Sequence, residues 1–274
     1  MSSVRDLLAG SDLPGATARL DAELLLCHCL DQQRAYLYTW PERELSAAEL
    51  EEFSRLMAAR REGQPLAYLT GQREFWSMPL AVNEHTLIPR PETETLVQWA
   101  LELPIVAAAS VLDWGTGSGA IALALASERP AWQVLASDSS TAALAVAAGN
   151  ASALGLDRVQ FLASNWGDSF AAECCDLIVS NPPYVAAQDP HLQQGDLRFE
   201  PATALVAGAD GLDAIRLIIE SAGSRLRAGG WLLLEHGFDQ ADSVRALLQA
   251  SGYQNAQSRR DLAGIERISG AQLP

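Results

Sequence analysis

The hydrophobic positions of this chain follow a helical period in its first 70 residues. One apolar stripe at the spacing of a helix face consists of Leu20, Leu24, Cys27 and Leu30. Ser46 and Glu49 have the spacing of a capping box, which opens a second helix. That helix carries Leu50, Phe53, Leu56 and Met57 on one side. The region therefore predicts a bundle of about four or five short helices.

From Ser110 onward the pattern changes to short apolar runs that alternate with Ala- and Leu-rich helical stretches. The predicted strands cover Ser110–Trp114, Trp132–Ser137, Val159–Ala163, Asp176–Ser180 and Gly230–Glu235. Further helices are predicted over Gly211–Arg227 and Gln240–Ala250, and an antiparallel hairpin over Tyr253–Ser269. This order predicts an α/β fold with an open sheet of mostly parallel strands.

The two patterns meet at an aromatic and proline-rich stretch. Residues 73–83 predict a short β-ribbon, and Pro91 suits the first turn of a helix because its missing N–H is not needed there. We therefore divide the chain into three parts. They are an N-terminal helical domain at 1–73, a β-hairpin or linker at 74–90 and a larger α/β domain at 91–274.

Composition excludes several kinds of chemistry. The net charge is −15, and all 19 basic residues are Arg, so no Lys is present. A Schiff base, pyridoxal phosphate chemistry and a Walker A loop all need a Lys and are excluded. Residues 1–73 carry a net charge of −3 and residues 74–274 a net charge of −12. The second region is thus a poor candidate for binding nucleic acid, because phosphate neutralisation requires clustered positive charge.

Other features predict a cytoplasmic protein without a membrane partner. The longest apolar stretches, such as Ala120–Ala126, are much shorter than a membrane span, and the first residues do not have the pattern of a signal peptide. The four Cys and four His lack zinc spacing, so we expect no metal site and reduced, structural cysteines. We also expect a monomer.

A glycine-rich loop follows the first predicted strand of the larger domain. Its sequence is Asp113-Trp-Gly-Thr-Gly-Ser-Gly119, and it leads into a helix. Glycines allow close backbone approach to a ligand, and Asp138, which ends the second strand, can accept hydrogen bonds from ribose hydroxyls. Two interpretations of this loop compete, a methyltransferase and a dehydrogenase. The second is possible because Gly115 to Ala120 also fit the dinucleotide fingerprint of dehydrogenases. Asp113 favours a methyltransferase, because its carboxylate can neutralise the ammonium of a methionine moiety but would repel a pyrophosphate.

The fourth predicted strand ends in Asn181-Pro-Pro-Tyr184. Two prolines cannot continue a central strand, so the chain leaves the sheet here as a stiff platform. A planar NH2 group needs two acceptors, which the Asn181 side-chain oxygen and the Pro182 carbonyl can supply, and Tyr184 can pack against its flat face. Holding both hydrogens out of plane would favour a pyramidal nitrogen aimed at an electrophile such as the methyl of S-adenosylmethionine (SAM).

The third predicted strand is followed by Ser164-Asn165-Trp166. In this fold that edge faces the adenine of a nucleoside cofactor. Asn165 can hydrogen-bond the edge of a base, and Trp166 offers a stacking face, although Trp166 could equally be a core residue.

These motifs resemble the protein-(glutamine-N5) methyltransferases that modify peptide chain release factors. The resemblance covers essentially the whole chain and also includes Thr70–Trp76, Leu87–Glu94 and Arg198–Pro201. It implies a class I SAM-dependent methyltransferase (Rossmann-like) domain with an N-terminal helical bundle domain for substrate recognition and a β-hairpin linker. It also implies SAM as cofactor and the glutamine of a Gly-Gly-Gln loop of release factors as acceptor, with an effect on translation termination.

The site residues can be assigned on this basis. The predicted cofactor-binding residues are Asp113, Gly115, Thr116, Gly117, Ser118, Gly119, Asp138, Asn165, Trp166 and Asn181. The predicted substrate-binding residues are Asn181, Pro182, Pro183 and Tyr184, of which Asn181, Pro182 and Tyr184 are assigned to catalysis. Position 165 is Asn here where relatives often have Asp.

Alternative functions predict different behaviour. An N6-adenine DNA methyltransferase would use the same planar NH2 chemistry, but the acidic larger domain argues against it. The protein could also be a SAM-binding module that tethers release factor without chemistry. In that case its effect in the cell would not depend on turnover. A dehydrogenase would be stabilised by NAD rather than by SAM.

Overall fold

The computed structural model describes residues 3–274, which form two compact units. The first unit comprises the chain as far as Gln72 together with Gln193–Phe199, and the second comprises Arg73–Leu192 and Glu200–Pro274. Within residues 3–274, no helix is both long and apolar enough to cross a membrane.

The N-terminal unit is helical, as the sequence predicts. Its helices are α1 (Val4–Ala9), α2 (Ala18–Leu30), α3 (Arg34–Thr39), α4 (Ala47–Arg61) and α5 (Leu66–Thr70). The predicted capping box of α4 is confirmed, since the Ser46 side chain accepts from the Glu49 N–H and the Glu49 carboxylate accepts from the Ser46 N–H. The apolar side of α4 is also confirmed, with Phe53, Leu56 and Met57 in the core of the unit.

The buried face of α2 differs from the predicted stripe. Ala22, Leu25 and Leu26 are fully buried, whereas Leu20 is 38% exposed. A charged residue of the same helix, Glu23, is also buried. Its carboxylate accepts hydrogen bonds from Arg19, Arg34 and Tyr38, which offset the cost of removing it from water.

A segment distant in sequence joins the N-terminal unit. In the segment Gln193–Phe199, Asp196 forms an ion pair with Arg60, which also pairs with the buried Asp21. Arg198 donates to the Glu62 carbonyl. The continuous boundary expected from the sequence does not include this segment, because nothing in its local pattern distinguishes it from an ordinary loop.

A β-hairpin follows the helical unit. Strands β1 (Gln72–Phe75) and β2 (Met78–Ala81) pair through a turn in which Trp76 and Ser77 have positive φ angles of 52° and 58°. The side chain of Asn150 accepts from the Ala81 N–H at 2.7 Å and donates to the carbonyls of Ala81 and Ser118. One buried amide therefore connects the hairpin to the glycine-rich loop.

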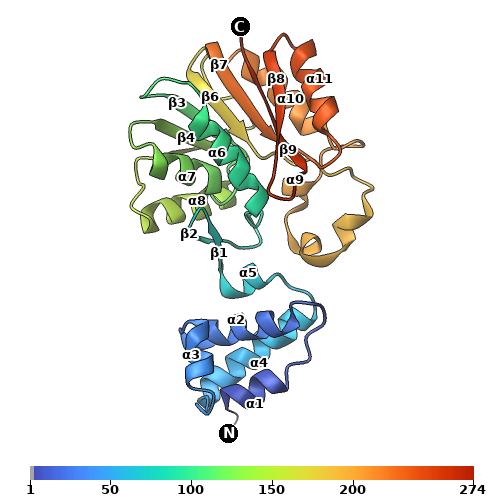
Figure 1. Cartoon of the computed structure of the whole chain (residues 1–274). Coiled ribbons are helices and arrows are strands. Elements are labelled where there is room, and N and C mark those ends of the chain that lie inside the picture. Colours follow the sequence, from blue (N-terminus) through green and yellow to red (C-terminus); the bar gives the residue numbers. More distant parts are fainter. Residues whose placement is uncertain (1–2) are drawn as a thin grey trace. The chain divides into compact units, whose positions relative to one another are not determined.

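The larger unit is a seven-stranded sheet with helices on both faces (Figure 1). Its strands are β3 (Ser110–Trp114), β4 (Gln133–Asp138), β5 (Gln160–Ala163), β6 (Cys175–Ser180), β7 (Leu226–Glu235), β8 (Gln254–Arg260) and β9 (Glu266–Gln272). The spatial order is β5-β4-β3-β6-β7-β9-β8, and in the described sheet β9 alone runs opposite to the other six strands. The predicted strands and the C-terminal hairpin are confirmed.

Helices of this unit cover both faces of the sheet. They are needed on both faces because successive residues of a strand point to opposite faces, and apolar residues occupy both. The helices are α6 (Glu94–Glu102), α7 (Ala120–Glu128), α8 (Thr141–Ala153), the short α9 (Ala202–Leu205), α10 (Asp213–Gly223) and α11 (Ala241–Ala250), with short 3-10 turns η1 (Pro91–Thr93) and η2 (Pro190–Gln193). A third turn, η3 (Gly195–Phe199), belongs to the segment that joins the N-terminal unit. Figure 1 shows α6, α7 and α8 on one face and α10 and α11 on the other. Alternate residues of β6 follow this division, since Leu177 packs in the core under α6 and α7 and Ile178 in the core under α10 and α11.

One predicted helix is too long. The helix expected over Gly211–Arg227 ends at Gly223, and β7 already begins at Leu226. Leu226 pairs with Cys175 of β6, and Arg227 forms an ion pair with Asp176. Strand pairing therefore overrides the helical preference of the local sequence.

The sheet register places the loops of the site side by side. Trp114, the last residue of β3, is aligned with Ser137 of β4 and with Ser180 of β6. Asp138 of β4 is aligned with Ala163 of β5. The glycine-rich loop, Asp138, the segment after β5 and the Asn181 segment consequently leave the sheet at one edge.

Gly119 joins this loop to α7 in a left-handed conformation, with φ of 87°. A Cβ there would lie 3.1 Å from Leu123 and 3.2 Å from Ala147, so α7 and α8 pack directly against it.

We predict that Gly119→Ala destabilises the protein more than Gly252→Ala does. Gly252 has the same φ of 87°, but a Cβ added there would meet no atom within 4 Å among the described residues, so its substitution measures backbone strain alone. The strain costs about 1–2 kcal/mol, and the close contacts of Gly119 add about 1–3 kcal/mol. Urea unfolding followed by circular dichroism measures both variants. Equal losses of unfolding free energy in the two variants would show that packing at Gly119 is loose.

Candidate active site

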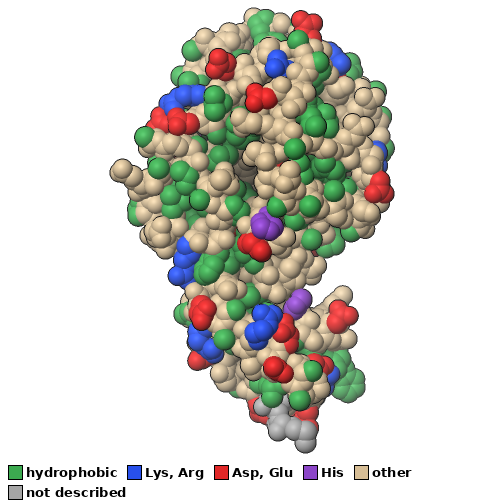
Figure 2. Space-filling view, turned by 180° about the vertical axis from the view of Figure 1, so that it is seen from behind, with side chains coloured by type: hydrophobic (Ala, Val, Ile, Leu, Met, Phe, Trp, Pro, Cys, Tyr) green, Lys and Arg blue, Asp and Glu red, His purple; other side chains and the backbone are tan. Residues whose placement is uncertain are grey.

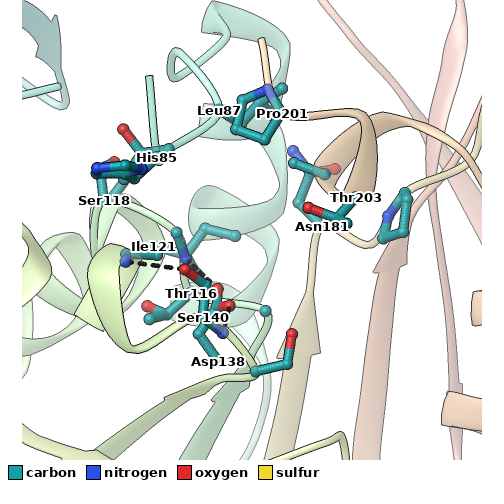
Figure 3. A pocket seen from close by; sticks show the side chains of 18 of the residues that line it. His85, Leu87, Thr116, Ser118, Ile121, Asp138, Ser140, Asn181, Pro201 and Thr203 are labelled. Carbon is teal, nitrogen blue, oxygen red and sulfur yellow. Dashed lines mark hydrogen bonds between the residues drawn. The ribbon is translucent and has the colours of Figure 1, made fainter. Parts of the chain in front are cut away.

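The carboxyl edge of the sheet carries a cavity of about 290 Å³. Four of its walls are the predicted segments that follow β3, β4, β5 and β6. Figure 3 shows Thr116, Asp138 and Ser140 on one side of the cavity and Asn181, Pro201 and Thr203 on another, and His85 and Ser118 also line it. The structure therefore brings together most of the residues selected from the sequence.

The glycine-rich loop is held by backbone hydrogen bonds to β4. The N–H groups of Gly115 and Thr116 both donate to the Ser137 carbonyl, at 2.8 and 2.9 Å. Gly115 has a φ of 75°, and a Cβ there would lie 3.3 Å from the Trp166 ring. Glycine at this position thus allows Trp166 to pack against the loop while both line the cavity.

Asp138 lies next to the glycine-rich loop, and backbone N–H groups hold both of its carboxylate oxygens in place. Oδ2 accepts from the Gly117 N–H at 3.0 Å, and Oδ1 accepts from the Ser140 N–H at 2.9 Å. Asp138 also lines the cavity. Each carboxylate oxygen has a further lone pair, so the residue can bind a pair of ligand hydroxyls from a fixed position.

Asp113 and Gly119 lie behind the loop rather than in the cavity wall. Asp113 is completely buried, and its Oδ2 accepts from the Thr116 hydroxyl at 2.6 Å and from the Ala122 N–H at 3.2 Å. The carboxylate therefore caps the first turn of α7 from strand β3. Burial raises the pKa of Asp113 to about 7, and the two hydrogen bonds lower it in part. Asp113 Oδ2 thus helps to shape the loop, while Oδ1 is buried and has no hydrogen-bond partner among residues 3–274. The contact of Asp113 with the ammonium of a methionine moiety stays a prediction.

The segment after β5 forms the adjacent wall. Ser164, Asn165 and Trp166 all line the cavity. Asn165 is exposed, and Trp166 adopts a positive φ of 47° and packs partly against the core under α10 and α11. The two interpretations of Trp166 are thus compatible, because one face of the side chain lies in the core and another borders the cavity.

The Asn181-Pro-Pro-Tyr184 segment contributes Asn181 and Pro183 to the wall. The Asn181 Nδ2 group donates to the Thr93 hydroxyl at 3.2 Å. Its Oδ1 is buried and has no hydrogen-bond partner among residues 3–274. A buried acceptor without a partner is costly in a folded protein, so it marks a position that a ligand donor can satisfy.

Pro182 and Tyr184 lie behind the cavity wall. Pro182 is buried, and the Tyr184 hydroxyl donates to Glu235 Oε1 at 3.3 Å. Burial raises the pKa of Tyr184, and the neighbouring Glu235 raises it further, so the phenol remains protonated. The contact of the Tyr184 ring with a substrate stays a prediction.

Two further walls were given no role in the sequence analysis. Residues 84–87 and Pro89 form one of them, and Pro201, Thr203 and Ala204 form the other. They are joined by Glu200, which is buried, accepts from the Ile88 N–H at 3.0 Å and pairs with Arg90. In the sequence Arg90 and Glu200 each neighbour a proline, but no local pattern pairs two residues so far apart.

The basic side chains of the larger unit are dispersed over the face that Figure 2 shows. On the face shown in Figure 2, the Arg side chains of this unit lie apart from one another and form no continuous basic surface in the described part of the chain. This distribution agrees with the net charge of −12 over residues 74–274.

Comparison with known proteins places this geometry in a family. A model of the PrmC N-terminal domain matches residues 4–71, and a model of the methyltransferase small domain matches residues 93–208. The catalytic domain of hMettl16, solved with a MAT2A 3′UTR hairpin, is 19% identical with a TM-score of 0.58 and covers 80% of this chain and 81% of that chain. At that identity the likeness shows the fold alone.

Similarity to named relatives extends over nearly the whole chain. The release factor glutamine methyltransferase of Xylella fastidiosa (strain Temecula1) is 52% identical over 257 residues, which are 93% of this chain and 94% of the relative. That of Pseudomonas aeruginosa is 50% identical over 270 residues, which are 98% of each chain. The chain therefore belongs to the release factor glutamine methyltransferase family.

Proposed function

We propose that the protein transfers the methyl group of SAM to the side-chain amide nitrogen, N5, of the glutamine in the Gly-Gly-Gln loop of peptide chain release factors, and so modulates translation termination. Family membership supports the reaction and the substrate class. The observation that carries the proposal is the buried Oδ1 of Asn181, an acceptor at the cavity wall without a partner among the described residues.

The cavity residues fit SAM. The backbone of Gly115–Ser118 would approach the methionine part, Asp138 would accept from the ribose hydroxyls, and Asn165 and Trp166 would contact the adenine. When bound, SAM supplies an electrophilic methyl group on a positively charged sulfur. The acidic character of the larger unit suits a cationic ligand.

The Asn181 segment would hold the acceptor amide. The two hydrogens of the glutamine NH2 would be donated to Asn181 Oδ1 and to the Pro182 carbonyl. The nitrogen lone pair of a free amide is delocalised into its carbonyl, and this pair of hydrogen bonds favours the pyramidal form that can attack an electrophile. No strong base is needed, because the methylated nitrogen is acidic and releases its extra proton readily.

The alternative of an N6-adenine DNA methyltransferase uses the same pair of acceptors. It is not favoured, because the named relatives modify release factors and the larger unit lacks a continuous basic surface on the face shown in Figure 2 within its described residues. We further propose that the protein acts in the cytoplasm, where release factors work. Its monomeric state stays a prediction.

We predict that the purified protein incubated with SAM adds one methyl group to its release factor, and that the label lies on the glutamine of the Gly-Gly-Gln loop. Tandem mass spectrometry of the digested factor locates the added mass. The matched control is a factor in which this glutamine is replaced by glutamate, which lacks the amide and should remain unmodified. Methyl transfer to duplex DNA, or to another residue of the factor, would contradict the proposal.

Asn181→Ala removes the unpartnered acceptor and should separate turnover from cofactor binding. We expect kcat to fall by about 100-fold or more, since a positioning interaction of the reacting group is lost. The dissociation constant for SAM should change by less than about fivefold, because the glycine-rich loop and Asp138 are intact. If kcat collapsed while translation termination in cells remained normal, a tethering module would replace the enzyme as the explanation.

Asp138→Ala should weaken SAM binding by about 10- to 100-fold, which corresponds to the loss of hydrogen bonds to a charged acceptor. Asp168→Ala is the control, because it removes an equal charge from an exposed position in the same unit. Isothermal titration calorimetry with SAM measures both variants. A similar affinity for the two would show that the loss of charge, and not the position of Asp138, governs binding.

A further inference from the structure

The Asn181–Tyr184 segment is anchored at both of its ends. Its first end continues strand β6, whose last residue, Ser180, donates from its hydroxyl to the Trp114 carbonyl at 2.6 Å. Its other end is held at the Tyr184 carbonyl, which accepts from the Nε2 group of Gln240 at 3.1 Å. The segment therefore bridges two fixed points, and the second of them is a side chain from a distant part of the chain.

The side-chain amide of Gln240 has a single orientation in its surroundings. Its Oε1 accepts from the Gly237 N–H at 2.8 Å, and its Nε2 donates to the carbonyls of Tyr184 and Asp210 at 3.1 and 3.3 Å. A reversed amide would set its NH2 group against an N–H donor and its oxygen against two carbonyl oxygens. The side chain, which belongs to a residue only 9% exposed, is thus fitted to these three backbone groups.

The place of Gln240 in the sequence shows that its side chain is not used for its own helix. Gln240 directly precedes α11, at the position where a polar side chain commonly caps the helix. Among the described residues its side chain makes no such cap hydrogen bond. It turns instead to the loops that follow β6 and β7 and to the loop that precedes α10, and so connects three loops of the larger unit.

The turn that supplies the Gly237 N–H is itself fixed. The buried His236 has its Nδ1 atom 2.9 Å from the Gly237 carbonyl and its Nε2 atom 2.8 Å from the hydroxyl of Ser269 in β9. Because a carbonyl can only accept, Nδ1 carries the proton and Nε2 accepts from Ser269. Gln240 is consequently held by a turn that is hydrogen-bonded to the sheet.

The Tyr184 carbonyl is also approached closely by the loop that precedes α10. Gly211 in this loop has a φ of 76°, and a Cβ there would lie 2.3 Å from the Tyr184 oxygen and 2.8 Å from Gln240 Nε2. Glycine permits this approach, because a side chain would displace either the carbonyl or the amide that holds it.

We propose that Gln240 is a positioning residue for methyl transfer, which fixes the end of the Asn181–Tyr184 segment and with it the Pro182 carbonyl and the Tyr184 ring. This inference rests on the proposed function. Among residues 3–274, Gln240 is not part of the cavity wall, so it acts through the segment and not by contact with the substrate. Two consecutive prolines make the segment stiff, and a shift of its end is therefore passed on to the Pro182 carbonyl. A displacement of about 1 Å at a reacting group can cost about 100-fold in rate.

Gln240→Met tests the proposal, because methionine has a similar length and makes none of the three hydrogen bonds. We expect kcat for release factor to fall by about 10- to 100-fold. The dissociation constant for SAM should stay within about twofold, because the glycine-rich loop and Asp138 are unchanged. The KM for release factor should change less than kcat. Gln249→Met is the matched control, since it makes the same replacement at an exposed position of α11 and should keep the kcat of the wild type.

Gly211→Ala reaches the same carbonyl from another loop and provides a second test if the methionine variant folds poorly. Its kcat should also fall by about 10- to 100-fold. Gly252→Ala is the control, because Gly252 has a φ of 87° and an added Cβ would meet no atom within 4 Å among the described residues. If both substitutions act through the Tyr184 carbonyl, the variant that combines Gln240→Met with Gly211→Ala should be about as slow as the slower single variant.

The outcomes separate the positioning role from a general loss of stability and from the proposed function. Losses of kcat that multiply in the combined variant would show two independent kinds of damage and would overturn the positioning role. A Gln240→Met variant with the kcat of the wild type would overturn it as well. If the wild type itself left release factor unmethylated, the proposed function would fail, which is a different result from an active wild type with equally active variants.

Discussion

The parallel pairing of β3 with β4 on one side and β6 on the other is the constraint from which the site follows. Because Trp114 is aligned with both Ser137 and Ser180, the loops after these three strands begin at the same height. The Ser180 hydroxyl donates to the Trp114 carbonyl at 2.6 Å and fixes this alignment just before two of the loops diverge. The cavity lies between them, at the point where the chain crosses from one half of the sheet to the other.

Buried polar groups behind the cavity keep its wall in place. Asp113 caps α7 and holds Thr116 beneath the glycine-rich loop, Glu200 holds Ile88 and Arg90, and Glu235 accepts from the Tyr184 hydroxyl. Each of these carboxyl groups is hidden from solvent, which is costly unless hydrogen bonds offset it. They contribute rigidity to residues that touch the ligand, and a rigid wall loses little entropy when it binds.

The sequence predicted the features that depend on local pattern and on strand order. The strand over Ser110–Trp114 has its expected bounds, and Asp138 and Asn181, which the sequence placed at the ends of two predicted strands, both line the cavity. Long-range polar contacts were not predictable in the same way. Nothing near Asp113 in sequence indicates that its carboxylate turns inward to the α7 N–H of Ala122, or that the pair Arg90 and Glu200 would join two segments more than 100 residues apart. Such pairs become visible only when the fold has brought them together.

A crystal structure of the protein with S-adenosylhomocysteine and a release factor would test the central claim most directly. The account predicts that the glutamine side-chain nitrogen lies within hydrogen-bond distance of Asn181 Oδ1 and of the Pro182 carbonyl, while Asn181 Nδ2 remains on the Thr93 hydroxyl. A glutamine bound elsewhere, or one that meets the nitrogen end of the Asn181 amide, would contradict it.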